Sequence, residues 1–195
     1  MSYKILAINP GSTSTKLAVF EDESCIFKVS LKHDAVMISK FEHVIDQYDF
    51  RMQAIKEELA KSEIDLSKLD AVVGRGGMLK PIEGGTYHVN EEMIDYVSKG
   101  IRGEHASNLG CIIAKRLADT YHINSFIVDP VAVDEMEDIA RYTGMPEIKR
   151  DSLFHALNQK AVAHRASQDL NKKYQDLNLI IAHLGGGISV GVHRK

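Results

Sequence analysis

Hydrophobic residues in the first thirty positions fall into three short runs that are separated by polar turns. The runs cover residues 4–9, 16–20 and 25–29, and the breaks contain proline, glycine, serine and acidic residues. Runs of this length with turn residues on both sides are typical of β-strands. Because the connections are short, we expect the three strands to pair in sequence order as an antiparallel meander, and not as a βαβ unit.

The spacing of the apolar residues then changes to three or four, which is the period of an amphipathic helix. Helices are predicted over residues 41–59 (with a possible break near Asp49), 93–97 and 109–121. Asp151 or Ser152 can cap a last helix, whose inner side includes Phe154 and Leu157. This interpretation places Phe154 and the histidine after it in the first helical turn.

Further strand-like runs alternate with these helices. They cover residues 69–74, 125–129, 177–183 and 188–192. The order predicts an α/β protein, with a complete βββαβαβα domain over residues 1–175. Residues 176–195 are expected to form the opening hairpin of a second, incomplete domain, because a strand, a glycine turn and a strand occur at 4–20 and again at 179–193.

Composition and charge argue against several classes of function. The 24 basic and 27 acidic residues give a net charge of −3 with no block of Lys or Arg, which argues against a nucleic-acid or anionic-membrane partner. No apolar run approaches the roughly 20 residues of a membrane span, and no signal-peptide layout is present. Two cysteines without a C-x-x-C motif imply neither a disulfide framework nor a zinc site. We therefore expect a soluble, cytoplasmic protein.

The first candidate for chemistry is the sequence Asn-Pro-Gly-Ser-Thr-Ser at positions 9–14. Gly11 permits an otherwise strained backbone, and Ser12 and Ser14 offer hydroxyl groups to an anion. The same residue types are common in ordinary hairpin turns, so the motif alone fits both interpretations equally. It is not a Walker loop, because no Gly-Lys-Ser/Thr follows.

Two more candidates end predicted strands. Arg75 is framed by glycines, where its guanidinium can grip a carboxylate or phosphate, although a surface arginine in a loop explains the motif as well. Asp129 closes the strand before Pro130, where it can hold Mg²⁺ or simply form a turn. A dinucleotide fingerprint is absent, since Leu79 occupies the position of its last glycine.

The remaining candidates are histidines and glycines. His155 follows Phe154 at the expected helix start, where a histidine is often only structural. His183 precedes Leu184 and three glycines, Gly185, Gly186 and Gly187. Three consecutive glycines are more than a tight turn needs, and without side chains they leave their backbone N–H groups accessible. We therefore favour a phosphate site there. A serine hydrolase is not indicated, because G-x-S-x-G does not occur.

Together, these motifs and their order resemble the acetate kinase family of acyl kinases, within the superfamily of actin, sugar kinases and chaperone ATPases. The matching segments lie at residues 8–16, 73–77, 103–108, 126–130, 153–155 and 182–195. Acetate kinases usually carry alanine where Pro10 stands and asparagine where Gly186 stands. Both differences resemble the butyrate-type branch, and Gly186 removes one side-chain donor to the nucleotide phosphates.

The resemblance implies a ribonuclease H-like domain of the actin-like ATPase superfamily and the direct, in-line transfer of phosphate from ATP to a short-chain carboxylate such as butyrate. It implies ATP/ADP and Mg²⁺ as cofactors, nucleotide and acid as partners, and a homo-oligomer. The implied roles are these: Arg75, Asp129 and His155 catalytic, with Asp129 also serving Mg²⁺; Asn9, Ser12, Ser14 and Phe154 near the phosphoryl group and acid; His183, Gly185, Gly186 and Gly187 facing the nucleotide phosphates.

The resemblance also implies that complete members of the family continue well past Lys195, with the adenosine pocket and a second essential arginine in the part that is absent here. Three alternatives therefore stay open. The chain can be a truncated, non-catalytic phosphate- or nucleotide-binding remnant, or a kinase for acetate, propionate or a branched acid. It can also be an actin-like or chaperone-like assembly module, although Arg75 and His155 count against this.

Overall fold

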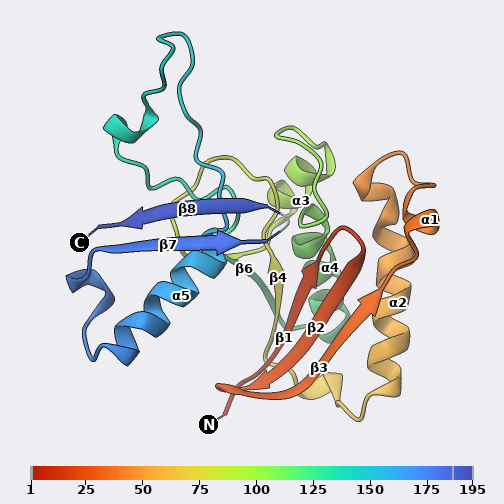
Figure 1. The fold of residues 1–195 in the computed structure, drawn as a ribbon. Coiled ribbons are helices and arrows are strands. Elements are labelled where there is room, and N and C mark those ends of the chain that lie inside the picture. Colours follow the sequence, from red (N-terminus) through yellow and green to blue (C-terminus); the bar gives the residue numbers. More distant parts are fainter. Residues whose placement is uncertain (1, 186, 195) are drawn as a thin grey trace. The chain divides into compact units, whose positions relative to one another are not determined.

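The first three strands form the expected antiparallel meander in a computed structural model that describes residues 2–185 and 187–194 (Figure 1). β1 (Lys4–Pro10) pairs with β2 (Ser14–Glu21), which pairs with β3 (Ser24–Lys32). Alternate residues of β1 and β2 are buried, including Leu6 and Val19. One face of these strands therefore contributes to a hydrophobic core.

Three more strands extend this sheet in the order β3-β2-β1-β4-β6-β5. β4 (Ala71–Arg75) lies parallel to β1, and β6 (Asn124–Val128) lies parallel to β4. β5 (Thr86–His88) pairs with β6 in the antiparallel direction. The mixed α/β sheet confirms the predicted fold class, while the three-residue β5 was too short for its pattern to predict.

Four α-helices are described in the same part of the chain; the last three lie near predicted positions, while the first, of four residues, was not predicted. They are α1 (Ala35–Ile38), α2 (Tyr48–Lys61), α3 (Glu91–Ser98) and α4 (Asn108–Tyr121). Short 3-10 turns lie at Val44–Gln47 and Leu66–Lys68. The predicted break in the first long helix therefore falls between Gln47 and Tyr48, where the 3-10 turn passes into α2.

A glycine pair allows α4 to lie close to β4, the strand that carries Arg75. A Cβ atom on Gly74 would lie 2.1 Å from the carbonyl oxygen of Gly110, and one on Gly110 would lie 2.1 Å from the carbonyl oxygen of Arg75. No side chain fits at either position without moving the backbone. These glycines therefore fix the distance between helix and sheet next to a candidate site residue.

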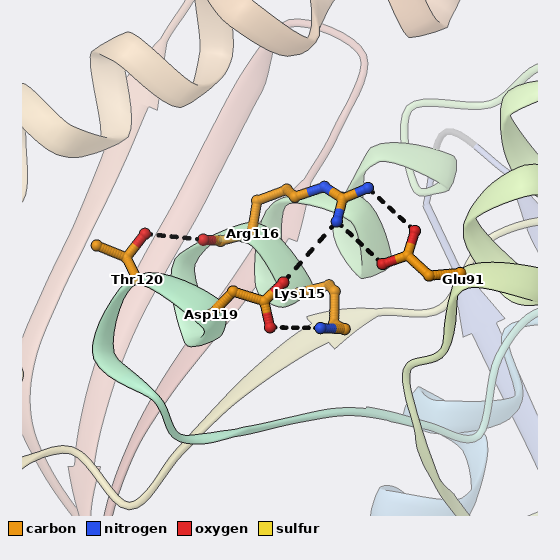
Figure 2. A network of polar contacts seen from close by, with 5 residues as sticks. All are labelled: Glu91, Lys115, Arg116, Asp119 and Thr120. Atoms are coloured by element: carbon orange, nitrogen blue, oxygen red, sulfur yellow. Dashed lines mark hydrogen bonds and ion pairs between the residues drawn. The ribbon is translucent and has the colours of Figure 1, made fainter.

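A surface network also links α3 to α4, as Figure 2 shows. Arg116 donates two hydrogen bonds to the Glu91 carboxylate, at 3.0 and 3.1 Å, while Lys115 contacts Asp119 one turn further along α4. The Glu91 side chain is well exposed, so each such ion pair contributes only about 0–1 kcal/mol to stability.

The rest of the chain contains a helix and a hairpin. α5 (Ala156–Asp169) packs against β7 (Leu179–Leu184), which pairs with β8 (Ile188–His193) as a separate two-stranded sheet. Short 3-10 turns lie at Asp138–Arg141 and Tyr174–Asp176. The hairpin exposes large apolar side chains, among them Ile180, Leu184, Ile188, Val190 and Val192.

These elements belong to two compact units. Unit 1 contains residues 1–79 and 85–128, and unit 2 contains residues 80–84 and 129–195. The domain boundary expected between residues 175 and 176 stays a prediction; residues 129–175 lie in the same unit as the hairpin. Within the described ranges, no helix is both long and apolar enough to cross a membrane.

Candidate functional site

The turn at residues 9–14 is tightly built. The Gly11 N–H donates to the carbonyl oxygen of Ser14 at 2.7 Å, and the His33 N–H donates to that of Thr13 at 2.9 Å. Ser12 and Thr13 are exposed. Their N–H groups and hydroxyls form no hydrogen bond within the described residues, so they are available to an anion.

Arg75 reaches this turn from the next parallel strand. β1 and β4 run in the same direction with Ile8 beside Gly74, so their ends bring Asn9 and Arg75 together. Nη1 of Arg75 donates to Oδ1 of Asn9 at 3.4 Å. Burial lowers the pKa of Arg75, but a guanidinium stays charged in proteins. Unit 1 therefore combines a fixed positive charge with a hydroxyl-rich turn.

His105 belongs to the surroundings of Arg75. Burial, and then the charge of Arg75, lower the pKa of His105. Its Nδ1 lies 2.7 Å from the Ser107 hydroxyl. Asn108, by contrast, is structural: its side chain accepts from the Met78 N–H at 2.9 Å and donates to the carbonyl oxygens of Gly103 and Val97.

In unit 2, Asp129 directly follows β6 and adopts a left-handed backbone conformation with φ of 38°. Such a conformation is strained for a residue other than glycine and occurs often at functional sites. Nζ of Lys160 lies 3.6 Å from the Asp129 carboxylate and 2.8 Å from that of Glu135. The pattern of the sequence did not indicate Lys160 or Glu135.

Lys160 remains a cation in this cluster. Burial lowers the pKa of Lys160, but the hydrogen bond to Glu135 and the charges of Asp129 and Glu135 outweigh that effect, and the pKa is raised. The cluster therefore joins two carboxylates and one ammonium. A Cβ atom on Gly84 would lie 2.5 Å from Oε1 of Glu135, so a larger residue there would displace the ends of the side chains in this cluster.

The helix that carries the candidate histidine begins later than predicted. α5 starts at Ala156, with His155 as the residue before its first turn, so the expectation of a cap at Asp151 or Ser152 is wrong. The physical reason is a tertiary contact: the buried Ser152 hydroxyl donates to the carbonyl oxygen of Val133 at 2.7 Å. His155 is therefore held at the helix end and not within its first turn.

The hydrogen bonds around Ser189 assign the tautomer of His155. The Ser189 hydroxyl oxygen accepts a hydrogen bond from the side-chain amide of the buried Gln159 at 3.0 Å and another from the backbone N–H of His155 at 3.3 Å. These two bonds use both of its lone pairs, so its own proton points to Nδ1 of His155, 2.8 Å away. In the neutral ring the hydrogen then lies on Nε2, which can donate to a phosphoryl oxygen.

His183 stacks on His155. The ring centroids are 3.7 Å apart and the planes differ by 6°. The Asn158 amide donates to Nδ1 of His183 at 3.0 Å, which fixes that ring as well. A Cβ atom on Gly187 would lie 3.2 Å from Cε1 and 3.4 Å from Nε2 of His155, so a side chain there would crowd the ring.

Each unit thus brings some of the predicted residues together. Asn9, Ser12, Ser14 and Arg75 gather in unit 1, while His155, His183, Gly185 and Gly187 gather in unit 2. Gly186 lies outside the described residues. Phe154 is half-buried, and its role in an acyl pocket stays a prediction.

Sequence patterns did not indicate four residues that support these two groups: Arg51 in unit 1, which donates to the Ser12 and Ser14 carbonyl oxygens, and Gln159, Lys160 and Ser189 in unit 2. Gly191 was a signal for Gln159, since a glycine inside a strand marks a close approach. A Cβ atom on Gly191 would lie 2.1 Å from Oε1 of Gln159.

Comparisons with known proteins show which sequences and folds this chain resembles. The chain is 53% identical over 195 residues to butyrate kinase 2 of Clostridium acetobutylicum. It is 54% identical over 195 residues to a probable butyrate kinase of Clostridium botulinum strain Eklund 17B, and 55% identical over 194 residues to that of strain Alaska E43. Each match covers the whole chain and 55% of the relative, so the chain spans about half the length of these proteins. No protein-family model matches.

Solved structures show the same fold. The Porphyromonas gingivalis acetate kinase matches 98% of this chain and 55% of its own, with a TM-score of 0.69 and 21% identity. A Francisella tularensis propionate kinase matches 97% of this chain and 54% of its own, with a TM-score of 0.61 and 19% identity. The chain is therefore similar to butyrate kinases in sequence and to acetate and propionate kinases in fold, which confirms the resemblance.

Proposed function

We propose that this chain is part of an ATP-dependent kinase that phosphorylates the carboxylate of a short-chain fatty acid, with butyrate as the acid. The observation that carries the proposal is the contact of Arg75 with Asn9 beside the exposed hydroxyls of the turn. The similarity to relatives named butyrate kinase supports the choice of acid.

In the proposed reaction, a carboxylate oxygen of the acid attacks the γ-phosphorus of ATP. The new P–O bond gives an acyl phosphate, and the bond to the β-phosphate oxygen breaks so that ADP leaves with its electron pair. A carboxylic acid has a pKa near that of Glu, about 4.3, so the nucleophile is already ionised at pH 7. The reaction needs no general base.

The protein has to bring an anion to a polyanion. Arg75 is suited to bind the acid carboxylate, because a guanidinium can grip both of its oxygens. The hydroxyls of Ser12 and Ser14 and the amide of Asn9 are suited to phosphoryl oxygens. Together they reduce charge repulsion and hold the acid for an in-line attack.

The stacked histidines supply further donors. In the tautomer assigned above, Nε2 of His155 carries the hydrogen, which suits a bond to the equatorial oxygens of the transferred group. His183, Gly185 and Gly187 are suited to the remaining nucleotide phosphates through ring and backbone N–H groups.

Asp129 is the residue suited to Mg²⁺. Within the described ranges no group of three or more His, Cys, Asp or Glu could hold a metal by itself. Mg²⁺ in kinases, however, is usually held by one or two carboxylates together with substrate phosphates, so a single aspartate fits. When bound, the ion would neutralise charge on the phosphate oxygens. We expect this activity in the cytoplasm and in a homo-oligomer.

The test is the formation of acyl phosphate, trapped as hydroxamate, with MgATP and straight-chain acids from acetate to valerate. The 195-residue chain is assayed beside a form extended to the length of its relatives. We expect the extended form to act with a maximum at butyrate. A profile centred on another acid would reassign the substrate, and no hydroxamate from either form would refute the kinase proposal.

A further inference from the structure

Arg51 is a completely buried arginine on α2 that uses all five of its N–H donors. Nε and Nη2 donate to Oε1 of Gln47 at 3.0 and 2.9 Å. Nη1 donates to Oγ1 of Thr15 and to the carbonyl oxygen of Ser14 at 3.1 and 3.3 Å, and Nη2 donates to the carbonyl oxygen of Ser12 at 2.9 Å. Every partner is neutral.

This guanidinium has no counter-ion within the described part of the chain. Its hydrogen-bond partners are an amide, a hydroxyl and two carbonyl groups, and it forms no ion pair there. His33, which contacts the same Thr15 hydroxyl, has its pKa lowered by burial and then by Arg51. A buried charge is costly unless it is compensated, so an anion at the nearby turn would relieve that cost.

Arg51 also determines which groups the turn presents. It binds the carbonyl oxygens of Ser12 and Ser14, while the His33 N–H binds that of Thr13. Three consecutive carbonyl groups are therefore occupied by donors from the protein. Because the peptide bonds are trans, the Thr13 N–H points away from the Ser12 carbonyl and so away from Arg51.

We propose that Arg51 is a positioning residue for phosphate binding: it holds the turn with its carbonyl groups turned inward and places an uncompensated positive charge behind it. This inference rests on the proposed function, because it takes residues 9–14 as a phosphate site. A residue that only stabilised the fold would need the hydrogen bonds but not the net charge.

The variant Gln47→Glu separates charge from structure. A carboxylate oxygen in place of Oε1 accepts the same two bonds from Arg51, but neutralises the guanidinium. Gln53→Glu is the matched control, because Gln53 lies on the exposed side of the same helix and the change in net charge is equal. Both are made in the form extended to the length of the relatives.

The readouts are the Kd of inorganic phosphate by calorimetry, the KM values for ATP and butyrate, and the melting temperature. We expect Gln47→Glu to weaken phosphate binding and raise the KM for ATP about tenfold, with a smaller change in the KM for butyrate and no loss of melting temperature. Gln53→Glu should match the wild type in phosphate affinity and in both KM values; its melting temperature should fall slightly, because the change puts a second carboxylate beside Glu57. Equal phosphate affinities in the two variants would overturn the role of the charge.

A second pair covers the case in which Gln47→Glu disturbs folding. Arg51→Lys keeps the positive charge but loses the planar set of guanidinium donors, whereas Arg51→Met loses both. The lysine variant should therefore bind phosphate more tightly than the methionine variant. Equal binding by these two would overturn the proposal. A wild type that makes acyl phosphate while the variants bind phosphate normally refutes only this inference; a wild type that binds no phosphate and makes no acyl phosphate refutes the proposed function too.

Discussion

The Ser189 hydroxyl lies 2.8 Å from Nδ1 of His155 and connects β8 to the start of α5. The same oxygen accepts a hydrogen bond from Gln159, one turn into the helix, at 3.0 Å. A strand residue thus fixes both the orientation of the imidazole and the nitrogen that carries its hydrogen. The histidine depends on this hydrogen bond for its proposed role.

Replacing Ser189 by alanine should therefore reduce turnover. Without the hydroxyl, Nδ1 of His155 loses its donor, and the ring can adopt the other tautomer. We expect kcat to fall about tenfold, the equivalent of about 1.4 kcal/mol, with smaller changes in both KM values. Ser167→Ala is the control, because its hydroxyl only donates to the His164 carbonyl within α5. The measurement is the steady-state kcat of both variants, made in the extended form. Equal kcat values in the two variants would contradict the tautomer assigned to His155.

The contact of α4 with β4 predicts a large effect of a single methyl group. Gly110→Ala places a Cβ atom 2.1 Å from the Arg75 carbonyl oxygen, so the helix or the strand must move. We expect a loss of about 2–4 kcal/mol in the free energy of unfolding, measured by urea titration. Gly144→Ala is the control, since its Cβ atom meets nothing within 4 Å. Similar losses of unfolding free energy in both variants would contradict the role of the close contact between α4 and β4.

His33 predicts a pH dependence of stability. Burial and the charge of Arg51 lower its pKa in the folded state, whereas in the unfolded chain it is about 6.5. Between these two values the unfolded chain binds more protons, so the free energy of unfolding should fall as the pH drops below about 6.5. His33→Gln removes this contribution.

The measurement is the difference in unfolding free energy between wild type and His33→Gln across pH 5 to 8. His105 and His193 are shifted in the same direction, so only this difference isolates His33. We expect the wild type to lose more stability on acidification than the variant. Parallel curves would contradict a buried, neutral His33.

Much of the site's framework was predictable because it depends on strand order. Asn9 lies near the end of one buried strand and Arg75 ends another, and parallel neighbours bring such ends together. The glycines that frame Arg75 were recognisable as a motif because they stand where the buried strand ends. Periodicity also located the long helices, because their apolar spacing is set by the core that they cover.

The supporting residues were not predictable, because their partners are distant in sequence. Lys160 and Arg51 each lie on an amphipathic helix where lysine and arginine are ordinary surface residues, and only the fold shows what they contact. Ser152 failed as a predicted cap for the same reason: its hydroxyl binds the Val133 carbonyl, a contact that no local pattern encodes.

The proposed role of Arg75 in binding the acid predicts how its replacement changes kcat/KM for butyrate. Arg75→Ala removes a charge-assisted bond to the carboxylate, which is worth about 1.5–3 kcal/mol, so kcat/KM for butyrate should fall about 10- to 150-fold. Arg75→Lys should recover only part of this, since an ammonium cannot grip both oxygens. Arg116→Ala, on the surface of α4, is the control. Unchanged butyrate kinetics in Arg75→Ala would refute the assignment.

The most direct test of the account is a phosphorus NMR measurement on the extended form with MgATP, in the presence and absence of butyrate. The account predicts that an acyl phosphate signal and ADP appear together, only when butyrate is present. ATP that is hydrolysed to inorganic phosphate at the same rate with and without the acid would contradict it.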